Sequence, residues 1–151
     1  MSAAKADKAP KKSRRKAREF AVQGLYQWQL TGGDAATILS QLREEKEFPK
    51  IDEEHLAVLL RGVTGQAQEL DALVAPYLDR PVGELSPVEH AILLLAAYEM
   101  KHHPEIPYRV VINEAVELAK TYGGTDGHKF VNGVLDKLAA QVRAVEVKGA
   151  R

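Results

Sequence analysis

The chain has 151 residues, of which 45% are apolar and 28% charged, so it is long enough to form one folded domain with a buried core. It has 21 basic and 21 acidic residues and no cysteine, which excludes disulfides, thiolate metal sites and cysteine nucleophiles. Its longest apolar run, residues 91–98, is too short to cross a bilayer. Residues 1–5 do not resemble a secretory signal. We therefore expect a cytoplasmic protein without membrane contact.

The zero net charge hides an uneven distribution along the chain. Residues 1–18 contain eight Lys or Arg and one acid, Asp7, so the remaining residues carry an excess of acids. Residues 1–12 are too polar to bury surface, and we expect a disordered basic arm there, followed by a single folded domain over residues 13–148. A cationic arm leading into a helix indicates nucleic-acid binding. The alternative is a solubilising or targeting tail.

Apolar residues at helical spacing predict a first helix that begins near Ser13. The glycines within residues 31–34 end it, and Asp34 can cap the next helix. A short second helix is marked by three apolar residues: Ile38, Leu39 and Leu42.

A long third helix is predicted after a break at residues 48–51. Asp52 can cap it, and its apolar positions continue to Tyr77. Gly62 and Gly65 are the positions where this helix could bend or be interrupted.

The second half of the chain predicts three more helices. The segment Ser86–Glu89 has the serine, proline and glutamate of a capping box, so a central apolar helix begins there. Two prolines make residues 101–107 a connector. A helix over residues 108–122 follows, and the last helix opens at Thr125 or Asp126. No strand is predicted, which favours an all-α helical bundle.

The sequence offers no convincing catalytic or metal site. Glu99 and His102 have the Glu-x-x-His spacing of di-iron bundles, but no second copy of that motif exists, and we expect His102 and His103 at the surface. Residues 123–129 resemble a phosphate-binding loop only loosely, because they lack its Gly-Lys-Ser/Thr ending. A turn between helices explains them better. We therefore expect no catalytic residue, no metal, no cofactor and no small-molecule substrate.

The basic start of the first helix is the strongest candidate site. At 3.6 residues per turn, four side chains lie in one sector that we expect to face outward: Arg15, Arg18, Val22 and Tyr26. Arg14 flanks this sector, while Trp28 turns toward the core. Guanidinium groups bind phosphates and tyrosine stacks on bases, so the sector suits single-stranded RNA.

Three motif segments occupy the two ends of the chain: Arg14–Leu30, Pro107–Lys120 and His128–Lys137. Through them the chain, from Ser13 to about Val142, resembles the NusB family of bacterial transcription antitermination factors. The resemblance implies two small helical subdomains. It also implies a non-enzymatic protein that binds the boxA element of nascent RNA together with NusE, a ribosomal small-subunit protein. The pair would then join the RNA polymerase antitermination complex, chiefly on ribosomal RNA operons.

The resemblance also implies which residues make contacts. Glu89 would face NusE. RNA would meet seven residues: Arg14, Arg15, Arg18, Tyr26, Asp126, Lys129 and Phe130. Compared with a family member that begins near its first arginine, this chain has the basic arm as an extra segment.

Two asparagines lie on otherwise apolar helices, Asn113 and Asn132, and we expect both to be buried and structural. A second interpretation of the whole chain is a noncatalytic module that recruits a protein partner. Such a module would be related to the RNA-binding domain fused to ribosomal RNA methyltransferases. No glycine-rich loop after a strand is present to hold a nucleotide cofactor, so a methyltransferase is excluded.

Overall fold

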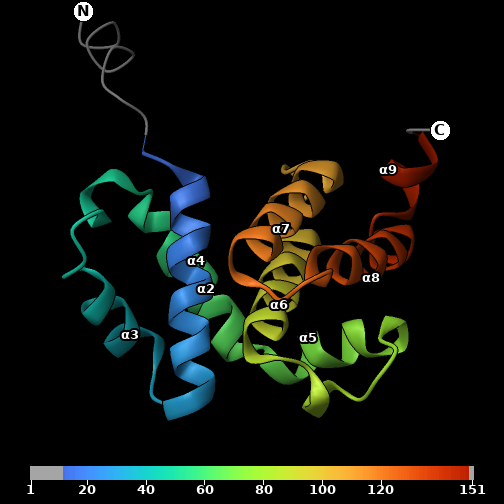
Figure 1. Cartoon of the computed structure of the whole chain (residues 1–151). Coiled ribbons are helices and arrows are strands. Elements are labelled where there is room, and N and C mark those ends of the chain that lie inside the picture. Colours follow the sequence, from blue (N-terminus) through green and yellow to red (C-terminus); the bar gives the residue numbers. More distant parts are fainter. Residues whose placement is uncertain (1–11, 150–151) are drawn as a thin grey trace, which may run out of the picture.

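The computed structural model describes residues 12–149 (Figure 1). The expected basic arm, residues 1–12, lies outside this range except for Lys12. The α-helices are α2 (Arg14–Thr31), α3 (Ala35–Leu42), α4 (Glu53–Gly65), α5 (Ala67–Val74), α6 (Pro87–His102), α7 (Tyr108–Tyr122), α8 (Gly127–Val142) and α9 (Ala144–Gly149). Three 3₁₀ turns join them: η1 (Phe48–Lys50), η2 (Ala75–Tyr77) and η3 (Val82–Glu84).

The helices form two groups around one core, which confirms the all-α prediction. Helices α2, α3 and α4 pack on one another, and α5, α7 and α8 pack around α6 (Figure 1). Helix α6 also contacts α2 and α4, so it joins the two groups. Its residues Ala91–Met100 are all buried, which makes it the central helix. No helix within the described range is long and apolar enough to span a membrane.

Side-chain caps fix the helix starts that the sequence predicts. The Ser13 hydroxyl accepts a hydrogen bond from the Lys16 amide at 3.0 Å, which opens α2. The Asp34 and Asp52 carboxylates cap α3 and α4 in the same way. At α6, the Ser86 hydroxyl accepts from the Glu89 amide at 3.2 Å. Each cap satisfies an amide that has no partner within its own helix.

The predicted third helix is interrupted directly after Gly65, one of the two glycines at which an interruption was expected, and the chain forms α4 and α5 with a break at Gln66. Its φ and ψ of −126° and 21° depart from helical values. Gly62 lies within α4, where a β-carbon would be 2.2 Å from the Tyr98 ring of α6. This glycine therefore lets α4 approach α6 closely. The break turns the following apolar residues of α5 onto α6 as well.

The start of α2 is fixed to a distant part of the chain. The Ser13 amide donates to the Lys50 carbonyl at 3.0 Å, and the Asp52 amide donates to the Ser13 carbonyl at 3.1 Å. Lys12 donates to the Pro49 carbonyl. The first basic residues of α2 therefore have a defined position.

The single domain expected over residues 13–148 stays a prediction.

Arg143, directly before helix α9, and Glu146 within it secure the connector between α6 and α7; the sequence did not predict this helix. Arg143 donates from Nε to the Met100 carbonyl at 2.7 Å and from Nη2 to the His103 carbonyl at 3.0 Å. Glu146 accepts from the Tyr108 amide at 2.8 Å. Glu146 thereby caps α7, whose N-cap residue is a proline without a capping side chain.

Candidate nucleic-acid interface

The basic residues that begin α2 lie at the surface, and each is paired with an acid. Arg14 lies 3.5 Å from Asp52, and Arg15 contacts Glu114 of α7 with N–O distances of 3.1 and 2.7 Å. The side chains of Arg14 and Arg15 are 48% and 63% exposed. The hydrogen bond and charge of Glu114 raise the pKa of Arg15, so its guanidinium stays charged. The carboxylates are less exposed, at 29% for Asp52 and 15% for Glu114, but both guanidinium groups face solvent, so a phosphate can compete for them.

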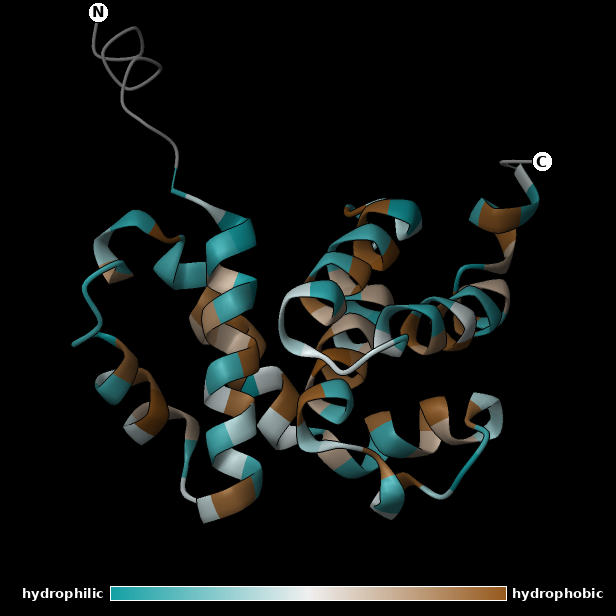
Figure 2. Ribbon diagram, in the orientation of Figure 1, coloured by the Kyte–Doolittle hydropathy of each residue, from teal (hydrophilic) through white to brown (hydrophobic). Residues whose placement is uncertain are grey.

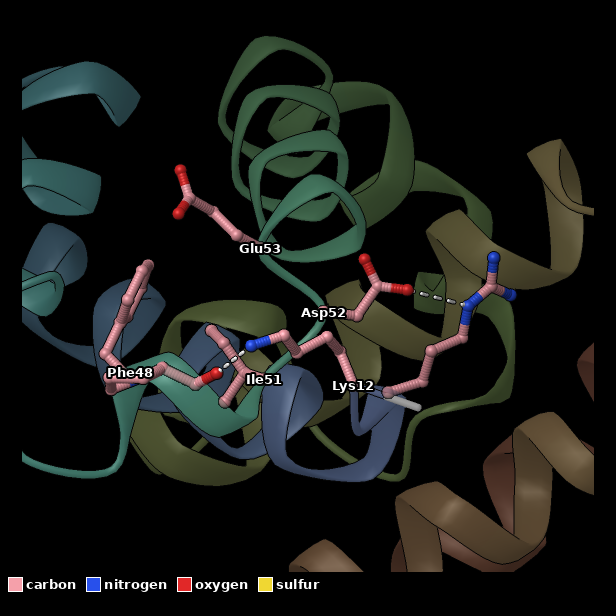
Figure 3. A pocket seen from close by; sticks show the side chains of 7 residues that line it. Lys12, Phe48, Ile51, Asp52 and Glu53 are labelled. Atoms are coloured by element: carbon pink, nitrogen blue, oxygen red, sulfur yellow. Dashed lines mark hydrogen bonds and ion pairs between the residues drawn. The ribbon is translucent and has the colours of Figure 1, made fainter. Parts of the chain in front are cut away.

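A cleft of about 700 Å³ opens beside Arg14. In Figure 3, the Lys12 side chain reaches across it to the backbone of the η1 segment, and Asp52 and Glu53 border it at the start of α4. The cleft therefore carries charges of both signs. Lys12 and Arg14 supply the cationic groups on the side of the basic arm.

Arg18 differs from Arg15 because it lies inside the protein. It is only 5% exposed, and its Nε lies 2.9 and 3.1 Å from the two carboxylate oxygens of Glu99. The predicted outward position of Arg18 is therefore wrong, as is that of Val22, which is 4% exposed. Helical spacing placed these residues on one side of α2 correctly. The spacing did not show that α6 packs against α2 and encloses Arg18.

Glu99 joins Arg18 to His55 of α4, whose Nε2 lies 2.9 Å from the second carboxylate oxygen. Burial by itself raises the pKa of Glu99, but the hydrogen bonds from His55 and Arg18 outweigh it and lower the pKa below its usual value. We call Arg18, His55 and Glu99 the buried triad. It fixes α2 and α4 to α6, and it places Arg18 beneath the surface that Arg15 forms.

The Glu99-x-x-His102 spacing serves two separate contacts. Glu99 belongs to the buried triad, whereas the exposed His102 lies 2.8 Å from the Gln66 side chain. His103 is only partly at the surface: its Nδ1 lies 2.9 Å from the Glu105 carboxylate, while its ring packs on His55 and its Nε2 is buried without a hydrogen-bond partner in the described part of the chain. Within residues 12–149, no group of three or more His, Cys, Asp or Glu is arranged to hold a metal ion.

A groove runs between α2 and α7, and Tyr26 lies in it. One end is acidic, with Glu19, Glu114 and Glu117 beside Arg15. The other end is mainly apolar and has a volume of about 250 Å³; its lining residues are Glu19, Val22, Gln23, Tyr26, Val88 and Tyr122. Tyr26 and Tyr122 are 40% and 46% exposed there. We call this end the apolar groove. It separates Tyr26 from the arginines with which the sequence had grouped it.

The turn between α7 and α8 carries the second set of predicted RNA contacts. Asp126 has a φ of 66°, the left-handed conformation that asparagine and aspartate tolerate better than most residues. Its carboxylate lies 3.3 Å from the Lys129 amine, and both side chains are more than 60% exposed. Phe130 is half-buried, and the Arg80 guanidinium covers its ring at 4.7 Å from the centroid.

Glu89, the predicted partner contact, lies against this turn. A β-carbon on Gly127 would be 2.5 Å from its Oε2, so only glycine leaves room for the carboxylate there. A carboxylate beside the first residue of α8 also complements the positive end of that helix. The structure thus brings Glu89 together with the segment Asp126–Phe130. Helix α7 connects this turn to Arg15 through Glu114.

The prediction that Asn113 and Asn132 are buried is wrong. Both side chains are exposed, and they border one shallow cleft between α7 and α8 together with Tyr108 and Arg109. Asparagine in an apolar helical pattern predicts burial only if its position falls on the buried side of the helix. In Figure 2, α7 and α8 both show hydrophilic positions alternating with hydrophobic ones.

Arg80 and Glu114 are residues of this surface that the sequence analysis did not assign. Arg80 lies between η2 and η3, far in sequence from Phe130, and nothing in its local sequence links it to α8. Glu114 was visible as an acid on an amphipathic helix, but its contact with Arg15 depends on how α7 lies beside α2.

The fold and this surface define an all-helical binding domain with exposed cationic residues at two places and an apolar groove between helices. The chain belongs to the NusB family, whose model matches residues 15–140. The chain is 66% identical over 130 residues to the transcription antitermination protein NusB of Nitrosospira multiformis, covering 86% of this chain and 82% of that protein. It is 59% identical over 141 residues to the protein of the same name from Paraburkholderia phytofirmans, covering 93% and 98%.

Solved structures show the same fold. T. maritima NusB superposes with a TM-score of 0.81 at 31% identity, covering 91% of this chain and 99% of that chain. A crystal structure of the antitermination factors NusB and NusE in complex with dsRNA gives a TM-score of 0.75 at 28% identity, covering 83% and 94%.

Proposed function

We propose that this protein is a transcription antitermination factor that binds the boxA element of nascent ribosomal RNA together with NusE. Membership of the NusB family carries the proposal, since close relatives bear the name transcription antitermination protein. The solved complex of NusB, NusE and RNA supports both partners. The pair formed with NusE would join RNA polymerase in the cytoplasm, and the chain would act by binding, without catalysis.

The proposed RNA surface consists of Arg14, Arg15 and Lys129. Each has an exposed side chain, and each is held in an ion pair by a single carboxylate: Asp52, Glu114 and Asp126, respectively. An RNA phosphate can replace such a carboxylate because exposed pairs contribute little. Arg18 would act on RNA only indirectly, by holding α2 in place through the buried triad.

The proposed NusE surface is the apolar groove with Glu89. Exposed Tyr26 and Tyr122 line a hollow that also includes Val88, and aromatic side chains of this kind are favoured at protein interfaces. Arg15 lines the other end of the groove, whereas no lysine or arginine among the described residues lines the end that holds Tyr26. We therefore place Tyr26 with the protein partner, although the family resemblance groups it with RNA.

The test compares RNA probes and partners directly. Affinity for single-stranded boxA RNA and for a duplex of the same sequence would be measured with and without NusE, over a range of salt concentrations. We expect the single strand to bind better and NusE to increase its affinity. Arg14→Ala with Arg15→Ala should weaken binding and reduce the salt slope by about 1.4, roughly 0.7 for each phosphate contact.

Arg61→Ala provides the control, because Arg61 is an exposed arginine of α4 outside these surfaces. An unchanged affinity and slope in the Arg14/Arg15 double variant would remove the proposed RNA surface. If NusE binds the chain but adds nothing to RNA affinity, the chain is instead a module that recruits a protein partner.

A further inference from the structure

Arg80 and Phe130 form a stacked pair at the end of the molecule that carries the turn between α7 and α8. The Arg80 guanidinium carbon lies 4.7 Å from the centre of the Phe130 ring. Phe130 packs on the core, so the guanidinium, not the ring, is the layer that meets solvent on this side. The Arg80 side chain is 39% exposed. A cation above an aromatic ring at this distance is an attractive contact.

Asp79 holds the plane of this guanidinium. Nε and Nη2 of Arg80 donate to the two Asp79 carboxylate oxygens at 2.6 and 3.0 Å. A guanidinium has five N–H groups, and this contact uses two of them. Of the three remaining donors, two lie on the end edge and one on the opposite side of the group, and no other hydrogen bond of Arg80 occurs within residues 12–149. The group is therefore fixed in orientation while its outer face and end edge remain accessible.

The surroundings of Arg80 favour a neutral ligand over a phosphate. The hydrogen bond to Asp79 raises the pKa of Arg80, and the charges of Asp79, Glu89 and Glu84 act in the same direction. These acids offset the positive charge that a phosphate would require. Lys129, next to Phe130 in sequence, is 73% exposed and is the better phosphate contact. A planar group with oriented donors suits a nucleobase, which has a flat face and hydrogen-bond acceptors at its edge.

We propose that Arg80 is the outer layer of a base-stacking platform, on which one unpaired base of single-stranded RNA lies with Phe130 beneath the guanidinium. The inference rests on the proposed RNA function and assigns to this turn the recognition of a base, beside the phosphate contact of Lys129. It requires no movement of Phe130. It also explains why a half-buried phenylalanine can contribute to an RNA site: its ring orients the arginine.

Arg80→Lys is the decisive variant, because lysine keeps the charge and the aliphatic stem but lacks the planar group. Its affinity for boxA single strands should fall about five-fold or more, with an unchanged salt slope. A set of probes with 2-aminopurine at successive positions should show one position whose fluorescence is quenched by the wild-type protein and not by Arg80→Lys. Arg61→Lys is the matched control, and thermal unfolding confirms that each variant is folded.

Wild-type affinity and quenching in Arg80→Lys would overturn the stacking platform while leaving the proposed function intact. The salt slope gives a second outcome. If Arg80→Ala reduces the slope by about 0.7 and Arg80→Lys restores it, Arg80 is a phosphate contact, and the platform is overturned as well. If the wild-type protein binds no RNA, the proposed function fails, and the platform fails with it.

Discussion

Arg15 and Arg18 lie one helical turn apart on α2, and both contact carboxylates, but they differ in exposure. Arg15 keeps most of its side chain in water while it holds Glu114, whereas Arg18 is enclosed with Glu99. An arginine that keeps most of its side chain in water can take up another anion at little cost. An enclosed arginine cannot, because separating Arg18 from Glu99 leaves a buried carboxylate with His55 as its remaining partner.

Arg18→Ala should therefore lower the free energy of unfolding by about 3 kcal/mol or more, since it leaves Glu99 charged and buried. Arg15→Ala should leave stability nearly unchanged and reduce RNA affinity instead. Urea unfolding and RNA titration of both variants separate these effects. Equal loss of stability in the two variants would contradict this division.

Glu99 should make the stability of the protein depend on pH. Its pKa is lower in the folded protein than the value of 4.5 expected after unfolding. The stabilisation is therefore complete above that value and is lost as the pH falls through the folded pKa. Urea unfolding at about pH 7 and about pH 4 measures the loss, and Glu99→Gln should make it smaller. An identical pH dependence in the variant would assign it to other acids.

Asp126→Asn should raise RNA affinity roughly two- to five-fold, the effect expected from one exposed ion pair. The change removes the charge that pairs with Lys129, and asparagine tolerates the left-handed backbone of this position. RNA titration at low salt measures the gain, which should vanish when Lys129→Ala is added. Weaker binding in Asp126→Asn would show that RNA donates a hydrogen bond to this carboxylate.

At the scale of elements, four helix starts follow from residues close to them. Ser13, Asp34, Asp52 and Ser86 each cap an amide three residues later, so the sequence alone located these starts. The break at Gln66 directly follows Gly65, where the sequence allowed an interruption although the apolar spacing continues through it. Helix α9 was missed because its position depends on Arg143, which donates to the Met100 carbonyl in the last turn of α6 and to the His103 carbonyl just after it.

Gly62 and Gly65 of α4 should respond in opposite ways to alanine. At Gly62 the new β-carbon meets the Tyr98 ring, so α4 and α6 must separate, which should cost about 1–3 kcal/mol. At Gly65 no atom lies within 4 Å of that position, and alanine should be neutral or stabilising. Thermal and urea unfolding of both variants test this. A neutral Gly62→Ala would mean that the ring moves aside without loss of packing.

At the scale of the whole molecule, the proposed partner surface exists only because three helices meet. Tyr26 comes from α2, Val88 from α6 and Tyr122 from α7. The Tyr122 hydroxyl lies 3.4 Å from the Glu19 carboxylate, a contact that joins α7 to α2. Gln29 of α2 donates to the Pro87 carbonyl at 2.9 Å and so fixes the start of α6 beside them.

Tyr26→Ala should weaken NusE binding about ten-fold or more while leaving binding of RNA to the isolated chain unchanged, because it removes an exposed aromatic from the apolar groove. Leu30→Ala is the control, since Leu30 is 60% exposed on the same helix and does not line the groove. Titration calorimetry with NusE and with RNA measures both affinities. The reverse pattern would return Tyr26 to the RNA surface.

The sequence by itself determined the helical class, most helix starts, the basic beginning of α2 and the resemblance to the NusB family. These depend on spacing and on contacts between residues three or four positions apart. The tertiary structure decided which polar residues reach solvent. Arg18 meets Glu99 from 81 residues away, and Arg80 covers Phe130 from the loop before α6. Helical periodicity gives the direction of a side chain, but only the packing of distant helices determines what lies in that direction.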